Sequence, residues 1–313
     1  MSVAAATLSV LLLGTLVVTT EIERVPGPAQ DSRGGARSLA WSDEFNGRRG
    51  ARPDQRKWSF ETGYGWGDGE LQSYTSRRRN AALDGRGHLV IAAHRERYTG
   101  ADQRPASYTS ARINSRTKFE FAYGRAEARI RVPRGRGLLP AFWALGSNLE
   151  TVGWPASGEI DVMEVHGGDP FTVHGSLHGP RVGHEAYAVE ATRRSRTRLS
   201  RGFHVYGVSW SPGRIAFRLD GDVYAVGTPS DLPAGSTWSF ERPFFLLLNV
   251  AVGPRWLGAP DATTPWPARM LVDWVRVRLG RATFCPTVRA RELRRRCPKR
   301  PPQRASAASE AGP

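Results

Sequence analysis

Short segments with the pattern of β-strands, separated by glycine and proline, are the feature that most limits the folds open to this chain. The clearest of these segments are residues 88–93, 112–121, 125–132, 203–210, 214–220, 244–252 and 270–279. No stretch keeps a helical period over three turns. With 34 glycines and 22 prolines to supply turns, this pattern predicts an all-β protein, an antiparallel two-sheet sandwich. One domain from about residue 38 to 280 follows.

Three turn signals set the expected connections. Asp220-Gly221 lies between two alternating runs and predicts a tight hairpin. Gly135-Arg136-Gly137 and Ser211-Pro212-Gly213 are expected to act in the same way.

Residues 157–166 place three carboxylates in an otherwise apolar, β-branched run. Strand alternation puts Glu159 and Asp161 on one face and would bury Glu164 on the other. A β-bulge at Val162-Met163 returns Glu164 to the face of Glu159. The glutamates then lie about four strand steps apart, roughly 13 Å between Cα atoms at about 3.3 Å per step.

That spacing has a chemical meaning. Side chains leaning together would leave about 5–7 Å between carboxyl groups, which includes the roughly 5–5.5 Å of retaining glycosidases. Trp143, Trp154 and His166 surround the run and favour a sugar-binding cleft. The rival interpretation is a solvated acidic face on an edge strand.

The net charge of +16 invites a nucleic-acid interpretation. Much of the excess lies in residues 281–313, which carry nine Lys or Arg against two Glu and are expected to be a disordered, solvated tail. No nucleic-acid-binding motif is present, so no nucleic-acid partner is expected. Cys285 and Cys297 in this tail either form a small disulfide loop or stay unpaired.

The N-terminus predicts export. Residues 3–18 are apolar and resemble the hydrophobic core of a secretion signal. We expect residues 1–20 to be this signal or an uncleaved anchor, unless the start codon is misassigned. Residues 21–37 then form a linker. The protein is expected to be secreted, with membrane contact only if the segment stays uncleaved.

At residues 157–164 the sequence resembles glycoside hydrolase family 16, in the bulged Glu-x-Asp-x-x-Glu form of its laminarinase-like members. The likeness continues through further motifs in the expected order, at residues 41–45, 70–72, 123–125, 140–143, 153–155, 177–179, 203–206, 249–253 and 272–277. It implies a β-jelly roll whose concave sheet forms an open polysaccharide cleft. It also implies a retaining endo-β-1,3-glucanase.

The resemblance assigns the catalytic roles. Glu159 is implied as the nucleophile and Glu164 as the general acid/base, while Asp161 is implied to hydrogen-bond the nucleophile. The requirement for one ionised and one protonated carboxyl group supports this division independently.

Weaker candidates surround these three residues. His178 either orients the acid/base or is a structural histidine. Trp143, Trp154 and Trp256 either stack on sugar rings or pack in the core. Glu70 and Asn249 are candidates for hydrogen bonds to hydroxyl groups.

No cofactor is expected beyond a structural calcium ion, for which the resemblance offers Glu44, Gly87 and Asp273. The chain departs from the family at Leu139, where a tryptophan is usual, and in the loop 253–258. Both departures leave the preferred polymer open. We expect a monomer that binds a β-glucan.

Other functions remain open at this point. On the same scaffold they are a β-1,3-1,4-glucanase, a galactan hydrolase, a transglycosylase and a non-catalytic glucan-recognition protein. A basic nucleic-acid-binding protein is the alternative from another class. Retention of both glutamates argues against the recognition protein, since a binder needs no acid/base pair.

Overall fold

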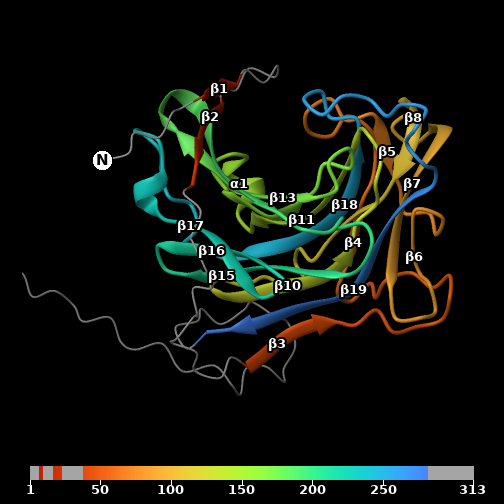
Figure 1. Cartoon of the computed structure of the whole chain (residues 1–313), viewed down its shortest axis with the longest axis horizontal. Coiled ribbons are helices and arrows are strands. Elements are labelled where there is room, and N and C mark those ends of the chain that lie inside the picture. The colour runs from red at the N-terminus through yellow and green to blue at the C-terminus, as the bar shows by residue number, and fades with distance from the viewer. Residues whose placement is uncertain (1–6, 10–16, 23–37, 281–313) are drawn as a thin grey trace, which may run out of the picture.

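The computed structural model describes residues 7–9, 17–22 and 38–280. Within them the chain forms two facing, mainly antiparallel sheets, as the short strand-like segments predict (Figure 1). The first sheet has the order β1 (Thr7–Ser9), β2 (Val17–Glu21), β14 (Glu185–Arg194), β13 (Thr172–Arg181), β12 (Glu159–Glu164), β11 (Leu138–Gly146), β18 (Phe244–Val252), β9 (Arg112–Asn114) and β4 (Ser59–Glu61). Only the contact of β2 with β14 in this sheet is parallel.

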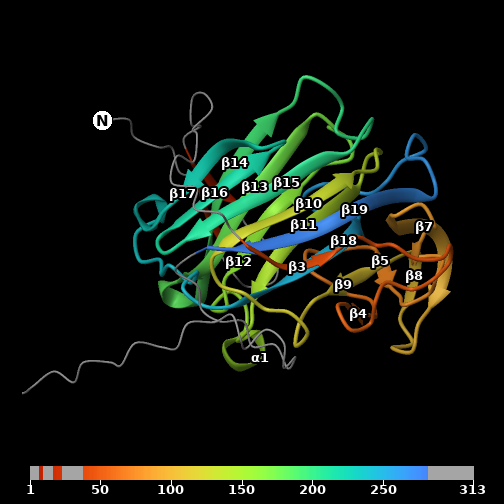
Figure 2. The same cartoon turned by 90° about the horizontal axis from the view of Figure 1, so that it is seen from below.

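The second sheet lies below the first in Figure 1 and faces the viewer in Figure 2. Its order is β17 (Asp222–Gly227), β16 (Arg214–Leu219), β15 (His204–Ser211), β10 (Gly124–Arg131), β19 (Ala268–Leu279), β7 (Leu89–Thr99), β8 (Pro105–Ser110) and β5 (Gln72–Tyr74). In addition, β3 (Ser38–Asp43) pairs with β19 and β6 (Ala81–Leu83) with β7.

Helical structure is confined to single turns. In the described residues these are α1 (Leu149–Val152) and the 3-10 turns η1 (Val182–His184) and η2 (Pro229–Asp231). None of these helices has the length or the apolar character needed to cross a membrane.

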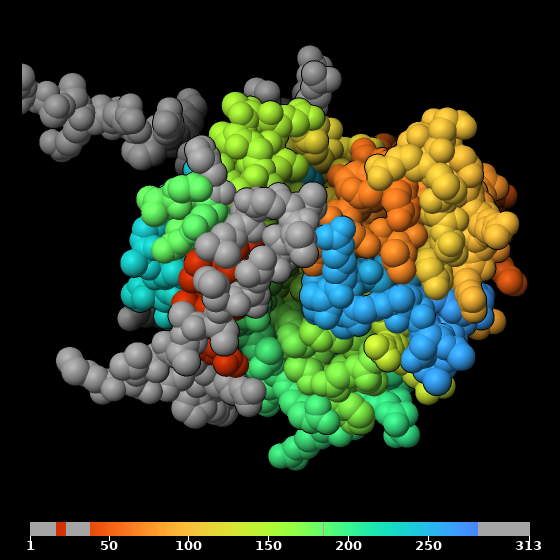
Figure 3. All heavy atoms as spheres, turned by 90° about the horizontal axis from the view of Figure 1, so that it is seen from above, coloured from red at the N-terminus to blue at the C-terminus, as the bar shows by residue number. Residues whose placement is uncertain are grey.

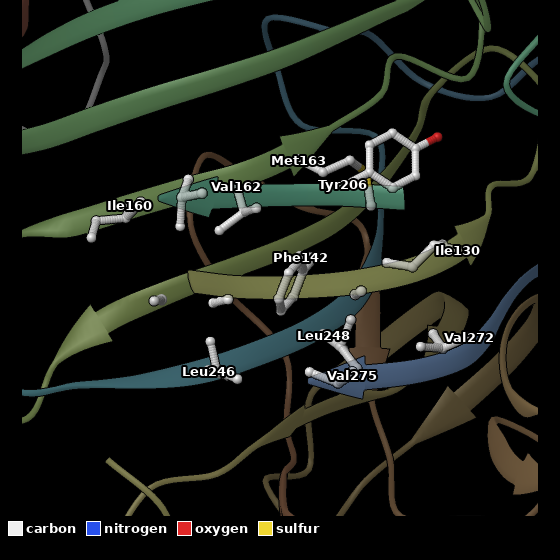
Figure 4. Close-up of a cluster of buried hydrophobic side chains, with 14 of the residues drawn as sticks. Ile130, Phe142, Ile160, Val162, Met163, Tyr206, Leu246, Leu248, Val272 and Val275 are labelled. Atoms are coloured by element: carbon white, nitrogen blue, oxygen red, sulfur yellow. The ribbon is translucent and has the colours of Figure 1, made fainter. Parts of the chain in front are cut away.

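The core lies between the two sheets. Figure 4 shows part of it, with side chains of β10, β11, β12, β15, β18 and β19 facing one another. Phe142 is fully buried at its centre. Val162 and Met163 are neighbours in the chain, yet both are buried in this core.

Replacing Phe142 by alanine tests this core. We expect a loss of about 3–5 kcal/mol in the free energy of unfolding, because a large cavity would form between the sheets. Denaturation in urea measures the change. The matched control is Leu39→Ala, since Leu39 is 48% exposed and should cost less than about 0.5 kcal/mol. Equal unfolding midpoints for the two variants would contradict this description of the core.

The turn predictions hold for two of three sites. Asp220 and Gly221 both have positive φ, 51° and 93°, and join β16 to β17 as a hairpin. Residues 211–214 likewise close the β15–β16 hairpin. The third prediction was wrong, because Gly135-Arg136-Gly137 connects β10 in one sheet to β11 in the other.

One predicted strand is too long. Residues 112–121 were expected to be extended throughout, but β9 ends at Asn114. Ser115 Oγ donates to the carbonyl of Phe119 at 2.7 Å, and Thr117 has a φ of 61°. This local hydrogen bond closes a turn in competition with the sheet ladder.

Residues 17–22 lie against the domain, although they were assigned to the export segment and the linker. Here β2 extends the first sheet beside β14, and Ile22 N–H donates to the carbonyl of Glu190 at 2.8 Å. The export prediction itself stays a prediction. The predicted tail at 281–313, with Cys285 and Cys297, lies outside the described residues.

Candidate active site

A bulge in β12 sets the direction of the three carboxylates. Against β11, Glu159 pairs with Leu145, Asp161 with Trp143 and Glu164 with Ala141, so that Val162 has no partner. Against β13 the register shifts between Asp161 and Glu164. The predicted bulge is therefore confirmed.

The consequence is a single acidic face. Ile160, Val162 and Met163 point into the core, so Glu159, Asp161 and Glu164 take the opposite side of the sheet. Leu145 and Ala141 are four residues apart on β11, which confirms the predicted four strand steps. The gap of about 5–7 Å between the carboxyl groups stays a prediction.

A glycine brings β11 and β12 together where the acidic face begins. A Cβ atom on Gly146 would lie 2.1 Å from the carbonyl oxygen of Ser157, closer than atoms can approach. Only glycine allows this contact. The close contact of Gly146 with Ser157 holds the turn before Glu159 against the end of β11.

This face looks into a hollow of the molecular surface. Figure 3 is viewed toward it, with the segment near residue 65 (orange) and the loop after β18 (blue) on one side and β2 (red) on the other. Trp154, which donates to Glu159, and Trp256, which contacts His166, are 43% and 50% exposed. Exposed tryptophans in a hollow fit stacking on sugar rings.

Asp161 lies at the centre of a hydrogen-bonded group. Ser176 Oγ donates to Asp161 Oδ2 at 2.7 Å, and His178 Nε2 lies 3.1 Å from the same oxygen. The resemblance implied a hydrogen bond from Asp161 to Glu159. In the structure Asp161 contacts His178 and Ser176, and its hydrogen bond to Glu159 stays a prediction. Sequence reasoning missed Ser176, although alternation from His178 along β13 places it on this face.

The charge of His178 depends on these acids. Burial disfavours its cation, but the hydrogen bond to Asp161 and the charges of Asp161, Glu159 and Glu164 raise the pKa of His178 to about 9. The ring is therefore cationic at neutral pH. Ligand atoms of Glu159, Asp161 and His178 lie within 4.8 Å of one another. The charge of His178 therefore partly offsets the charges of the two acids in this group.

The two glutamates differ in what surrounds them. Burial and the charge of Asp161 raise the pKa of both. For Glu159 the indole N–H of Trp154, which donates to Oε2 at 2.8 Å, and the Arg112 cation oppose the rise. For Glu164 the neighbouring charges of Glu159 and Glu190 increase the pKa further. The contacts of Glu159 thus favour its ionised form, whereas the charges around Glu164 favour its protonated form.

Trp143 is fixed by polar contacts in a half-buried position. Its Nε1 donates to Asn249 Oδ1 at 2.7 Å, and Asn249 Nδ2 donates to the hydroxyl of Tyr74 at 3.1 Å. Tyr74 in turn donates to Glu70 at 3.1 Å. Asn249 is only 5% exposed. Asn249 and Glu70 therefore support Trp143 from behind, and their contact with sugar hydroxyls stays a prediction.

The Arg112 cation stacks on Trp143, and the sequence analysis did not identify it as a site residue. The guanidinium carbon of Arg112 lies 4.5 Å from the Trp143 ring and 4.7 Å from the Trp66 ring, and its charge is balanced by Glu61. Such stacking fixes both rings in place. Trp66, Arg112 and Trp143 are far apart in the sequence, so no local pattern indicates their contact.

A histidine pair lies on the other side of Glu164. The rings of His166 and His174 stack with centroids 3.9 Å apart, and Trp256 meets His166 edge-on at 4.9 Å. His174 pairs with Glu164 across β12 and β13. Burial and the neighbouring ring lower the pKa of His174 to about 4, so the pair is neutral at neutral pH.

The predicted calcium residues have other partners. Both carboxylate oxygens of Glu44 accept from Arg276, at 3.0 and 2.7 Å, and Asp273 pairs with Arg129. Gly87 has only backbone atoms to offer. Since both carboxylates already bind arginines, these three residues do not fit a calcium site as they are arranged here. Calcium binding stays an untested prediction.

Exchange of His178 for glutamine tests the charge balance. Losing this cation raises the pKa of Glu159, which must be ionised to react. We expect the acid limb of the pH profile of kcat/KM to move up by about one pH unit. Hydrolysis rates measured across the pH range give the shift. The control is His204→Gln, whose ring pairs with Asp220 in the second sheet. An unshifted profile for His178→Gln would show that this charge does not tune the nucleophile.

Comparison with known proteins gives one consistent result. The sequence profile of "Glycosyl hydrolases family 16" matches residues 70–276. A beta-glucanase of Rhodothermus marinus is 40% identical over 253 residues, which cover 76% of this chain and 84% of that protein. A glucan endo-1,3-beta-glucosidase of Cryptopygus antarcticus is 38% identical over 243 residues, covering 74% and 88%. The X-ray structure of an endo-beta-1,3-glucanase from Pyrococcus furiosus matches with a TM-score of 0.71 and 42% identity, over 78% of this chain and 94% of that one.

Proposed function

The chain belongs to glycosyl hydrolases family 16, and from this membership we propose that it is an endo-β-1,3-glucanase that cleaves with retention of configuration. The observation that carries the mechanism is the bulge in β12, which turns Glu159, Asp161 and Glu164 onto one face. The substrate is a β-glucan of the laminarin type. Two relatives that are similar over most of both chains, from Cryptopygus antarcticus and Pyrococcus furiosus, are named for the same linkage.

The first half of the reaction forms a covalent intermediate. Glu164 gives its proton to the glycosidic oxygen while the carboxylate of Glu159 attacks the anomeric carbon from the opposite side of the ring. The bond from that carbon to the leaving oxygen breaks, and an ester to Glu159 forms. The raised pKa of Glu164 fits the donor of this step.

The second half restores the enzyme. Glu164, now ionised, takes a proton from water, and the hydroxyl oxygen attacks the anomeric carbon and displaces Glu159. Two inversions give net retention. Asp161 and His178 keep the local charge balanced while Glu159 passes between carboxylate and ester, since their ion pair lies beside it.

One assay tests the substrate and the mode of cleavage. The purified protein is incubated with laminarin, lichenan, agarose and carrageenan, and the products are sized over time. Mixed oligosaccharides appearing early from laminarin are the expected result. Product from another polymer but not from laminarin would contradict the assignment of linkage. Glucan binding without any product would support the recognition protein instead.

We further infer that the protein acts outside the cell as a monomer. The apolar stretch at residues 3–18 supports export, and a polymeric substrate requires it. N-terminal sequencing of protein from the culture medium and size-exclusion chromatography test the two statements. A mature chain starting at or before Val17 would keep β2 beside β14.

A further inference from the structure

A second hollow, on the outer face of the second sheet, is lined by arginines. Its volume is about 860 Å³, within the range of roughly 300–1,000 Å³ that is typical of ligand sites. Six arginines from four separate segments line it: Arg48, Arg49, Arg78, Arg79, Arg86 and Arg269. We call this hollow the arginine groove.

The groove faces away from the carboxylates. Along β7 the side chains of Leu89, Ile91 and Ala93 lie in the core between the sheets. Val90 and Ala92, which line the groove, therefore point outward. Arg269 lies opposite Ala92 on the adjacent strand β19. A polymer in the groove and a glucan at β12 would occupy opposite sides of the sandwich.

The positive charge of the groove is largely uncompensated. Arg79 pairs with Glu96 at 2.8 Å, whereas the other five arginines make no ion pair within the described part of the chain. Asp84 is the one acidic residue in the lining. It accepts hydrogen bonds from the backbone amides of Arg86 and His88, at 2.7 and 3.1 Å, and pairs with the His88 ring at 2.7 Å. Close, unpaired cations in a concave surface attract anions strongly.

The lining indicates which kind of anion fits. No aromatic side chain that could stack on a nucleic-acid base is among the lining residues, apart from the edge of His94, which bonds the carbonyl of Arg79 at 3.0 Å. The large exposed apolar residues of the described chain, such as Trp154, Trp256 and Val182, lie elsewhere, so nothing here would insert into a lipid layer. Guanidinium groups pair with carboxylates, as with phosphates, in a planar, two-bonded geometry, and the phosphates of nucleic acids and lipids are disfavoured by the lining described above. Val90, which is partly exposed in the groove, offers an apolar surface to the C–H groups of sugars.

We propose that the arginine groove binds a linear acidic polysaccharide through its carboxylate groups. Such a site would hold the enzyme on a charged polymer while the opposite face is free to cleave a neutral glucan. The binding site does not depend on the proposed function, because no residue of the groove belongs to the acidic face.

Charge reversal tests the proposal on the full-length protein. Polygalacturonate is the probe, and binding is measured by affinity electrophoresis and by titration at low and high salt. We expect Arg78→Glu combined with Arg269→Glu to weaken binding at least about tenfold at low salt, where charges are least screened. The matched control combines Arg193→Glu with Arg196→Glu. These arginines are exposed as well, make no ion pair in the described region and undergo the same change of charge.

Three further measurements test folding, the location of the site and the class of ligand. Laminarin hydrolysis by both double variants is expected to match the parent protein, which shows that folding and catalysis are intact. Equal loss of polygalacturonate binding in both double variants would overturn the groove as the site. Binding of duplex or single-stranded DNA, or of phosphatidylglycerol vesicles, as tight as binding of polygalacturonate would overturn the choice of an acidic polysaccharide.

Discussion

Glu159→Gln is expected to lower kcat on laminarin by at least about 10⁴-fold, since the variant has no group able to form the glycosyl ester. Glutamine has the shape of glutamate, and its amide oxygen can still accept from the indole N–H of Trp154. The change also removes a carboxylate that repels Asp161. The charge of Asp161 raises the pKa of Glu159, which shows that the two groups repel each other when both are ionised. The melting temperature should therefore stay the same or rise.

The sharpest control for this variant is Glu190→Gln. Glu190 lies on β14 opposite Ser176, in the same row as Asp161, and burial raises its pKa too. Glu190 lies two strands away from Asp161, so its carboxyl group does not take part in the bond changes at the anomeric carbon. We therefore expect activity to fall less than about tenfold. Steady-state kinetics on laminarin with both variants gives the comparison. A Glu159→Gln enzyme that keeps more than about one hundredth of the activity would exclude Glu159 as the nucleophile.

The acidic face could be predicted from sequence because it depends on one local rule. Side chains alternate along a strand, so three acids with the spacing of Glu159, Asp161 and Glu164 share a face only if one residue is inserted. The apolar identity of Val162 and Met163 showed where that insertion belongs. The same rule could have found Ser176 and His174, which alternate with Leu177 and Val173 on β13.

The rest of the site depends on contacts between distant segments. Arg112 meets Trp66 and Trp143 only because β9, a loop and β11 converge, and no periodicity records that convergence. The arginine groove is invisible in the sequence for the same reason. The predicted extent of the strand after Arg112 failed because a single side-chain hydrogen bond from Ser115 ended it, an effect that hydrophobic patterns do not report.

Glu164→Ala is expected to lower the rate of hydrolysis by an amount that depends on the leaving group of the substrate. On laminarin the leaving group is a sugar alkoxide that needs a proton, so the rate should fall by about 10²–10⁴-fold. On a dinitrophenyl glycoside of a short β-1,3-glucan the leaving group is already a weak base, and formation of the intermediate should be nearly unaffected. Hydrolysis of the intermediate then limits turnover, since Glu164 no longer activates water.

Azide makes this prediction decisive. The small anion fits the space left by the Glu164 side chain and needs no general base, so it should restore turnover of the dinitrophenyl substrate by Glu164→Ala and give a β-glycosyl azide. In Glu159→Ala, azide would attack from the side of the missing nucleophile and give the α product. The configuration of each azide is read by NMR. Two outcomes would contradict these roles: identical behaviour of the two variants on the activated substrate, or an α azide from Glu164→Ala. The reason is that a β azide forms only if an ester to Glu159 forms first.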